Sequence, residues 1–147
     1  MKYILFFVAL FSFNGLWAQN KSVKVDTHNQ KAVAVAVEWT ALLTAGENVE
    51  KIMTLTALPF VNDGDEIFLT KQEVLDFYKS VISNKGKRKV PQMKGSVLSE
   101  RNEILDHCIP VAYTVVAIDI EFEGKKERLV VSVSSVNGEY KVAGYND

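Results

Sequence analysis

The sequence has one cysteine, two histidines and three prolines among its 147 residues, and no excess of charge of either sign. Because Cys108 has no second cysteine to pair with, the fold must rely on a hydrophobic core rather than on an intramolecular disulfide. His28 lies far from His107 and Cys108 in the chain, and this spacing matches no metal site. The chain also has no glycine-rich phosphate loop, serine elbow or dinucleotide fingerprint, so we expect neither a metal nor a cofactor.

Charge excludes a further class of partner. The chain carries 17 Lys and Arg against 18 Asp and Glu, a net charge of −1. Basic residues gather in one place, Lys85, Lys87, Arg88 and Lys89, which we interpret as a solvated loop after a helix. Nucleic-acid binding requires a whole basic face. We therefore expect no nucleic-acid partner and no binding to an anionic membrane surface.

The first residues are typical of a secretory signal peptide. Lys2 precedes an apolar run from Tyr3 to about Phe13, and Ala18 stands where cleavage is expected. A membrane-spanning helix needs about 20 apolar residues. The run is shorter than that, which disfavours the alternative of an anchor that is never cut.

This leader divides the chain into three parts. We expect a signal peptide at 1–18, a loose segment at 19–27 and a single domain at 28–147. The processed protein would carry 16 basic and 18 acidic residues, a net charge of −2. We expect it to be exported, to the periplasm or the medium, without a stable membrane anchor.

Three helices are expected in the first half of the domain. The stretch from Thr27 to Gly46 fits both a strand alternation and a helical stripe, and its alanines and end signals favour a helix. A second helix should occupy 47–58, since the residue before a proline avoids helical geometry. The clearest helix begins at the capping box formed by Thr70 and Glu73.

The rest of the domain alternates like strands. Asp63-Gly64 predicts a short hairpin within 60–69, and a calcium site is disfavoured there because the spacing does not match a calcium loop. Long strands are expected at 92–100, 110–123, 127–136 and 139–147, separated by turns. Helices followed by strands indicate an α+β fold. We expect three N-terminal helices packed on a strongly curved antiparallel sheet of about four long strands plus the short hairpin.

These features resemble the nuclear transport factor 2-like superfamily, also called the cystatin-like α+β cone. The resemblance rests on an Ala-rich first helix bearing Trp39, on the segment LPFVNDGDEIFLTKQEVLDFYKSV, and on the ending VNGEYKVAGYND. It covers residues 28–147 and its motifs are structural. It implies a cone that opens between helices and sheet, with an apolar interior. Members include isomerases, dehydratases, polyketide cyclases, transport factors and exported domains.

The family's catalytic sets use an Asp with a Tyr, or an Asp–His pair, inside the cone. The weak candidates here are Asp119 and Tyr113, which share one face of a strand. The more apolar face of that strand carries Thr114, Val116 and Ile118. Because an antiparallel sheet buries its more apolar face, we expect Asp119 to point outward.

Aromatic and aliphatic stripes on the helices and strands should point into the cone. A ligand pocket lined by them is one interpretation, and a filled core is the other. The candidate ligand-binding residues are Trp39, Phe60, Phe68, Phe77, Tyr78, Ile118 and Ile120.

The sequence favours an exported, non-catalytic module that binds a small apolar or amphipathic ligand, or a partner protein, through its cone or sheet face. One alternative is an isomerase-, dehydratase- or cyclase-like enzyme with an acid–base residue in the cone. The other is a structural envelope protein. Apolar residues on the outer sheet face, Val111 and Val115 among them, predict a homodimer formed through that face.

The run Asp106-His107-Cys108 invites a catalytic interpretation. In a strand, however, His107 and Cys108 point to opposite faces and cannot form a dyad. With Pro110 following, the run is interpreted as the entry to a strand.

Overall fold

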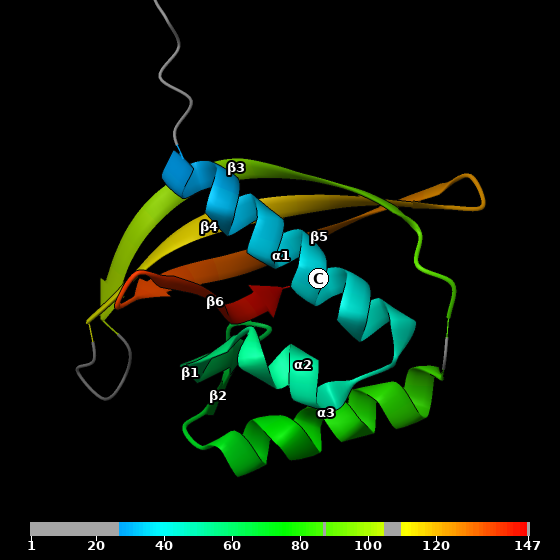
Figure 1. Ribbon diagram of the computed structural model, residues 1–147, viewed down its shortest axis with the longest axis horizontal. Coiled ribbons are helices and arrows are strands. Elements are labelled where there is room, and N and C mark those ends of the chain that lie inside the picture. Colours follow the sequence, from blue (N-terminus) through cyan, green and yellow to red (C-terminus); the bar gives the residue numbers. More distant parts are fainter. Residues whose placement is uncertain (1–26, 87, 105–109, 147) are drawn as a thin grey trace, which may run out of the picture.

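The computed structural model describes residues 27–86, 88–104 and 110–146, with backbone alone at 101–104, 110 and 111. The proposed signal peptide and the Asp106-His107-Cys108 run lie outside these residues. Three helices pack on one six-stranded sheet (Figure 1). The helices are α1 (Thr27–Ala45), α2 (Val49–Thr54) and α3 (Lys71–Lys85), and the strands are β1 (Thr56–Asn62), β2 (Glu66–Phe68), β3 (Gln92–Ile104), β4 (Pro110–Phe122), β5 (Lys125–Val136) and β6 (Glu139–Asn146).

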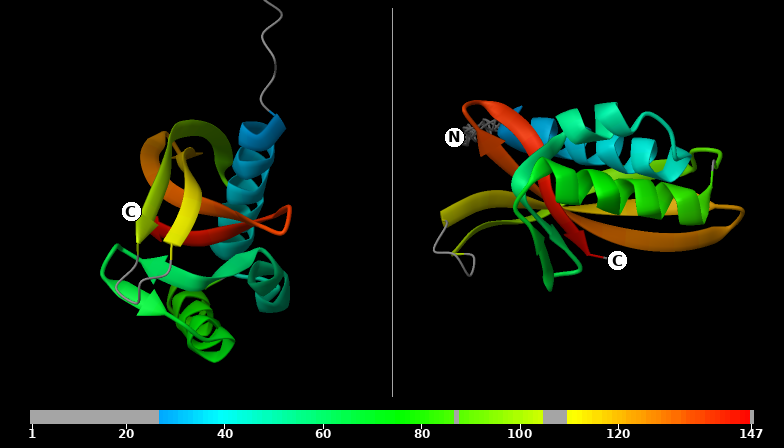
Figure 2. Two further views of the ribbon diagram at one scale, coloured as in Figure 1. Left: turned by 90° about the vertical axis from the view of Figure 1, so that its left-hand side faces the viewer. Right: turned by 90° about the horizontal axis from the view of Figure 1, so that it is seen from below.

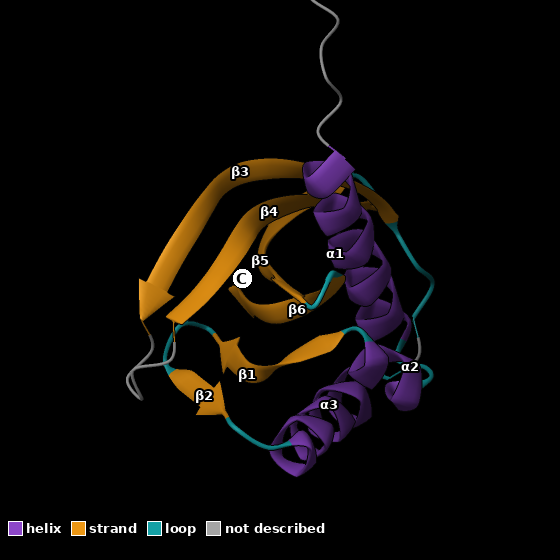
Figure 3. Ribbon diagram, turned by 60° about the vertical axis from the view of Figure 1, so that its left-hand side comes forward, coloured by secondary structure: helices purple, strands orange, loops and turns teal. Residues whose placement is uncertain are grey.

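The sheet has the order β2-β1-β6-β5-β4-β3. It bends into an open arc, with β3 and β4 on one side, β1 and β2 on the other, and α1 crossing its concave face (Figure 3). Neighbouring strands are antiparallel except β1 and β6, which run parallel. The α+β class and the curved sheet are therefore confirmed, and the parallel pair makes the sheet mixed.

Local signals place most of the boundaries. Thr70 and Glu73 form the predicted capping box at the start of α3. Asp63-Gly64 and Asn137-Gly138 lie in hairpin turns and have positive φ at both residues, the backbone conformation that such tight turns favour. α1 ends at Ala45, and the next residue, Gly46, has φ +69° and donates its backbone N–H to the Leu42 carbonyl at 3.1 Å.

The second helix is shorter than predicted. It ends at Thr54 instead of Leu58, and Thr56 begins β1. The Thr56 hydroxyl donates to the Ile52 carbonyl at 2.8 Å and lies 2.8 Å from the Tyr78 hydroxyl. Pairing with β6, from Thr56 opposite Val142, takes up the backbone that a longer helix would have used.

The core lies between the helices and the concave face. Trp39, Phe60, Tyr78 and Ile118 are fully buried there. The N-terminal half of α1 approaches the sheet closely at Gly95, where a Cβ atom would come within 2.7 Å of Val33 Cγ1. α1 and α3 both lie on this side of the long strands (Figure 2).

Candidate functional site

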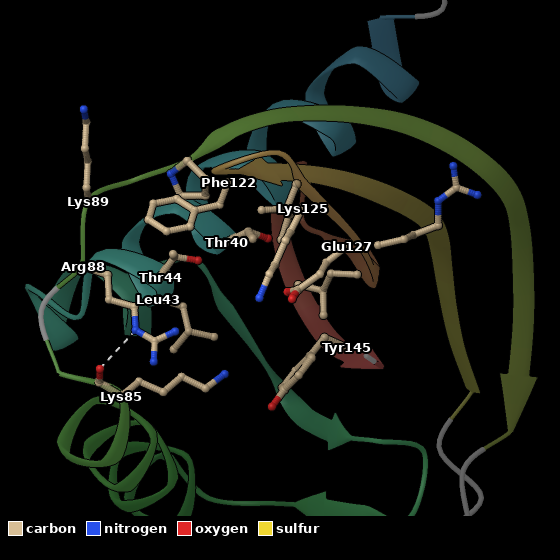
Figure 4. Close-up of a pocket in the computed structure, with 14 residues that line it drawn as sticks. Thr40, Leu43, Thr44, Lys85, Arg88, Lys89, Phe122, Lys125, Glu127 and Tyr145 are labelled. Atoms are coloured by element: carbon tan, nitrogen blue, oxygen red, sulfur yellow. Dashed lines mark hydrogen bonds between the residues drawn. The ribbon is translucent and has the colours of Figure 1, made fainter.

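A cavity of about 540 Å³ opens on the concave side of the sheet (Figure 4). It lies between the C-terminal half of α1, the segment that joins α3 to β3, and the end of the β4–β5 hairpin. Its volume falls within the range of small-molecule sites, about 300–1,000 Å³. Of the residues predicted to bind a ligand, Ile120 lines this cavity.

Apolar side chains form most of the cavity wall. Leu43 comes from α1, Ile120 from β4, Leu129 from β5 and Tyr145 from β6. Phe122 also lines the cavity and is 44% exposed. An aromatic ring left in water at the edge of a cavity is a surface on which an apolar molecule could pack.

Charged side chains surround this wall. The basic side chains in the lining include Lys85, Arg88, Lys89 and Lys125. Glu127 is the one carboxylate among the described lining residues. In Figure 4 the side chains of Lys85, Arg88 and Lys125 extend toward the space between α1 and β5, while Lys89 extends away from it. The cavity therefore combines an apolar wall with a cationic rim.

The position of the basic segment is fixed by backbone contacts at two helix ends. The Arg88 N–H donates to the Ala45 carbonyl at 3.3 Å, and the Gly86 N–H donates to the Ile82 carbonyl at 2.8 Å. The Arg88 Nε donates to the Lys85 carbonyl at 3.2 Å. Gly46 also approaches so closely that a Cβ atom on it would lie 2.8 Å from the Gly86 oxygen. The C-terminus of α1 thus holds this segment against the cavity.

The predicted aromatic residues converge, but they do so in the core. Trp39, Phe60 and Tyr78 are fully buried, and their rings lie within 6.2 Å of one another. Phe68 and Phe77 pack on this group, with ring centroids 5.2 Å apart. Tyr145 lies with its ring centre 5.5 Å from that of Trp39 and also lines the cavity, so the floor on that side is a ring that packs on the aromatic cluster.

A buried polar chain crosses the aromatic cluster. The Trp39 indole N–H donates to the Tyr78 hydroxyl at 3.0 Å, and the Tyr78 hydroxyl is also bonded to Thr56. Burial raises the pKa of Tyr78 above its ordinary value, and the two hydrogen bonds offset only part of that rise. The phenol is therefore held neutral and serves as a structural link between α1, α3 and β1.

The candidate catalytic residues lie on the outer face of the sheet. Asp119 pairs with Arg128 across the β4–β5 ladder, with Nε 2.7 Å from Oδ1, and about half of its side chain is exposed. The hydrogen bond from Arg128 lowers the pKa of Asp119. Tyr113 shares this face and is partly buried, whereas Thr114, Val116 and Ile118 on the other face are buried. The predicted outward orientation of Asp119 is confirmed.

The outer face exposes less apolar surface than the sequence predicts. Ala117 is fully buried and Val115 is 6% exposed, although both point away from the main core. Ala117 is flanked by Ser96 and Val130, and Val115 by Ser99 and Ser132. Both residues lie within the sheet, with a paired strand on each side.

The charged side of the cavity was not predicted from the sequence. We interpreted the basic loop as solvated and assigned no role to Lys125 or Glu127. A signal was present, because Lys125 and Glu127 have the same strand parity as Leu129, Val131 and Val133, which face the concave side. Charged residues at inward positions near a strand end indicate that the interior is open to water there.

A second polar cluster involves the start of α1. His28 Nδ1 lies 2.8 Å from the Tyr140 hydroxyl, and its Nε2 lies 3.1 Å from Thr114 Oγ1. Lys31 Nζ lies 5.8 Å from the centre of the Tyr140 ring. These contacts tie the first turn of α1 to β4 and β6.

Within the described ranges, no three His, Cys, Asp or Glu side chains gather closely enough to hold a metal ion. None of the helices in that part of the chain combines the length and apolar character needed to cross a bilayer.

The fold was compared with solved structures. A designed protein, "Rd1NTF2_05 with long sheet", has a TM-score of 0.50 at 13% identity, over 80% of this chain and 93% of that one. The chain has an NTF2-like fold. An NTF2-like protein of unknown function from Pseudomonas putida KT2440 gives 0.44 at 10% identity, over 82% of this chain and 84% of that one. The association domain of C. elegans CaMKII gives 0.41 at 12% identity, over 82% and 94%.

Neither a protein-family model nor a curated protein sequence matches the chain. The NTF2-like fold confirms the resemblance noted from the sequence at the level of architecture. Identities this low show a shared fold alone, so a function for this NTF2-like domain has to be argued from its own cavity.

Proposed function

We propose that this NTF2-like domain is a non-catalytic module that holds one small amphipathic molecule in its cavity. The observation that carries the proposal is the cavity of about 540 Å³, which joins an apolar wall to a charged rim. Sites for small molecules combine a concave apolar surface with a few placed polar groups. Leu43, Ile120 and Leu129 supply the first, and Lys85 and Arg88 contribute to the second.

The position of Asp119 argues against the catalytic role for which the sequence offered it. A general base must lie within hydrogen-bonding reach of the substrate proton. Asp119, the carboxylate that the sequence offers for this role, is ion-paired on the outer face of the sheet. The cavity opens on the opposite, concave face.

Binding can be tested with N-phenyl-1-naphthylamine, a neutral apolar dye whose fluorescence rises in an apolar site. The protein should bind one dye per chain. Thr44→Trp places a large ring among the lining residues and should abolish the signal. The control Leu98→Trp adds the same ring at a side chain that is 54% exposed, and should leave binding unchanged. Equal dye binding by both folded variants would refute the cavity as the site.

We also propose that two copies pair through the outer face of the sheet. Tyr113, Val130 and Val136 share that face by strand parity, and Val136 is 51% exposed. Analytical ultracentrifugation at micromolar concentration should give the mass of a dimer. Val130→Asp should shift that mass to a monomer, because it places charge in the contact. A monomeric mass for the unaltered protein would exclude this proposal.

We further propose that the domain acts outside the cytoplasm, on the strength of the leader at 1–18. N-terminal sequencing of protein recovered from the periplasm or medium should begin at Gln19. Recovery of the full-length chain from the membrane fraction would instead indicate an uncleaved anchor.

A further inference from the structure

We infer that the occupant of the cavity is an anion: a single-chain amphiphile whose carboxylate or phosphate head binds Lys85, Arg88 and Lys125. This inference rests on the proposed binding function and names the class of ligand. It assigns a role to the basic segment after α3, which the sequence alone presents as a solvated loop.

Positive charge is in excess around the opening of the cavity. Four Lys or Arg residues line the cavity besides Arg128, whose side chain is engaged with Asp119, and Glu127 is the one described carboxylate among the lining residues. Like charges focused in a cleft with low-dielectric walls create a field that attracts an anion. The net charge of the whole chain is −1, so this field is local.

Three of these basic side chains have no described carboxylate close enough to form an ion pair. Elsewhere on the surface, Lys51 lies 2.8 Å from Glu38 and Lys141 lies 3.2 Å from Glu139. Among the described residues, Lys85, Arg88 and Lys125 have no carboxylate within 4.0 Å. An anionic ligand would supply the missing partner for all three.

The side chain of Arg88 is oriented by hydrogen bonds to two helix ends. Its Nε donates to the Lys85 carbonyl at 3.2 Å, and its backbone N–H donates to the Ala45 carbonyl. These two bonds hold the guanidinium plane in place. Its two terminal nitrogens are bonded to no described acceptor. They can therefore donate a bidentate pair of hydrogen bonds to two oxygens of a carboxylate or phosphate.

The apolar wall of the cavity indicates that the anionic head group carries an apolar chain. Beyond the basic side chains the wall is apolar, with Leu43, Ile120 and Leu129 at its sides and Tyr145 at its floor. Phe122, 44% exposed, stands where a chain leaving the head group would pass. A small inorganic anion would leave this apolar surface wet, whereas a chain attached to the anion would cover it.

The basic residues have another use that must be distinguished from ligand binding. Cations near helix C-termini stabilise the last turn, and Lys85 and Arg88 lie at the end of α3. Under that explanation alone, replacing Arg88 would lower the melting temperature and would leave ligand selectivity unchanged. The experiment therefore measures selectivity.

The test compares decanoate, decyl phosphate and decanol as competitors of the bound dye. Decanoate or decyl phosphate should bind at least about tenfold more tightly than decanol, the size expected of one charge-assisted hydrogen bond. This preference should shrink as salt is raised. Whichever anion binds more tightly identifies the head group.

Three variants locate the head group. Arg88→Met and Lys125→Met should each remove most of the preference for the anion while leaving decanol affinity unchanged. The control is Lys79→Met, because Lys79 is an exposed residue of α3 outside the cavity lining and its loss should preserve the preference. If Arg88→Met does not fold, Lys125→Met on β5 decides the question alone.

The possible failures are distinguishable. If decanol and decanoate bind equally, the inference is overturned and the binding function stands. If neither the dye nor any decyl compound binds, the proposed function fails. Capture of the protein on phosphatidylglycerol vesicles without decanoate binding would also overturn the inference, since it would assign the basic residues to a membrane surface.

Discussion

The indole N–H of Trp39 donates to the hydroxyl of Tyr78 at 3.0 Å, and neither side chain is exposed to solvent. This bond joins the C-terminal half of α1 to the middle of α3, through two residues that lie 39 positions apart in the chain. Thr56 at the start of β1 bonds to the same hydroxyl. One phenol oxygen therefore fixes three elements that support the floor of the cavity.

Removing that oxygen should destabilise the fold. Tyr78→Phe leaves the buried Trp39 N–H without its partner, and an unsatisfied buried donor costs about 1–3 kcal/mol. Urea unfolding should show this loss with an unchanged m-value. Ser80→Ala, on the exposed side of the same helix, is the control and should change stability by less than about 0.5 kcal/mol. Equal stability of the two variants would show that the bond contributes nothing.

Alkaline titration should separate Tyr78 from the less buried phenols. An ordinary tyrosine ionises near pH 10, and burial raises the pKa of Tyr78 above this. The native state therefore keeps a proton that the unfolded state loses, so stability is full below about pH 10 and falls as pH rises further. Absorbance at 295 nm should show one tyrosine ionising together with unfolding. Its ionisation in the native protein alongside the others would contradict the burial argument.

Two glycine substitutions should differ in their effect on stability and on binding. Gly46 and Gly64 both have positive φ, so alanine strains the backbone at each. At Gly46 the added Cβ also meets the Gly86 oxygen at 2.8 Å, whereas at Gly64 nothing lies within 4 Å. We expect Gly46→Ala to be the less stable variant and to displace the basic segment.

Binding measurements complete this comparison. Gly46→Ala should weaken decanoate binding more than decanol binding, because it moves Arg88 and leaves the apolar wall in place. Gly64→Ala should bind both as the unaltered protein does. If the two variants unfold at the same urea concentration, the close approach of Gly46 and Gly86 has no energetic consequence.

The ion pair between Arg128 and Asp119 should affect titration, and removal of its carboxylate alone should leave binding unchanged. Arg128→Met removes the hydrogen bond that lowers the pKa of Asp119, so the carboxyl should titrate closer to its ordinary value in a carbon-detected NMR experiment. The contribution of the pair is present above that ordinary value and is lost as pH falls through the lowered one. Asp119→Asn should bind the dye normally, and a loss of binding would place Asp119 in the site after all.

The sequence predicts features that depend on neighbouring residues. The Thr70–Glu73 capping box, the stop at Gly46 and the turns at Asp63-Gly64 and Asn137-Gly138 each need a few adjacent residues, and all appear as expected. The start of β1 did not, because Thr56 becomes a strand by pairing with Val142, 86 positions away. No local pattern reports a contact of that kind.

The candidate site shows a different limit. Periodicity indicates that Trp39, Phe77 and Ile120 point inward, but it cannot tell a filled core from a cavity wall. That distinction depends on how far α1 stands from the sheet along its length. Lys85 and Arg88 are far from Lys125 in the chain, and the three approach one cavity only once the helices and the hairpin are in place.

The close approach at Gly95 has a consequence for how this domain could diverge or be redesigned. Val33 and Val37 of α1 lie directly against that glycine, while residues further along the helix, Thr40, Leu43 and Thr44, line the cavity. A methyl group at position 95 would push up one end of a rigid rod and tilt the other. A substitution at position 95, which is outside the cavity lining, would therefore change the volume of the cavity.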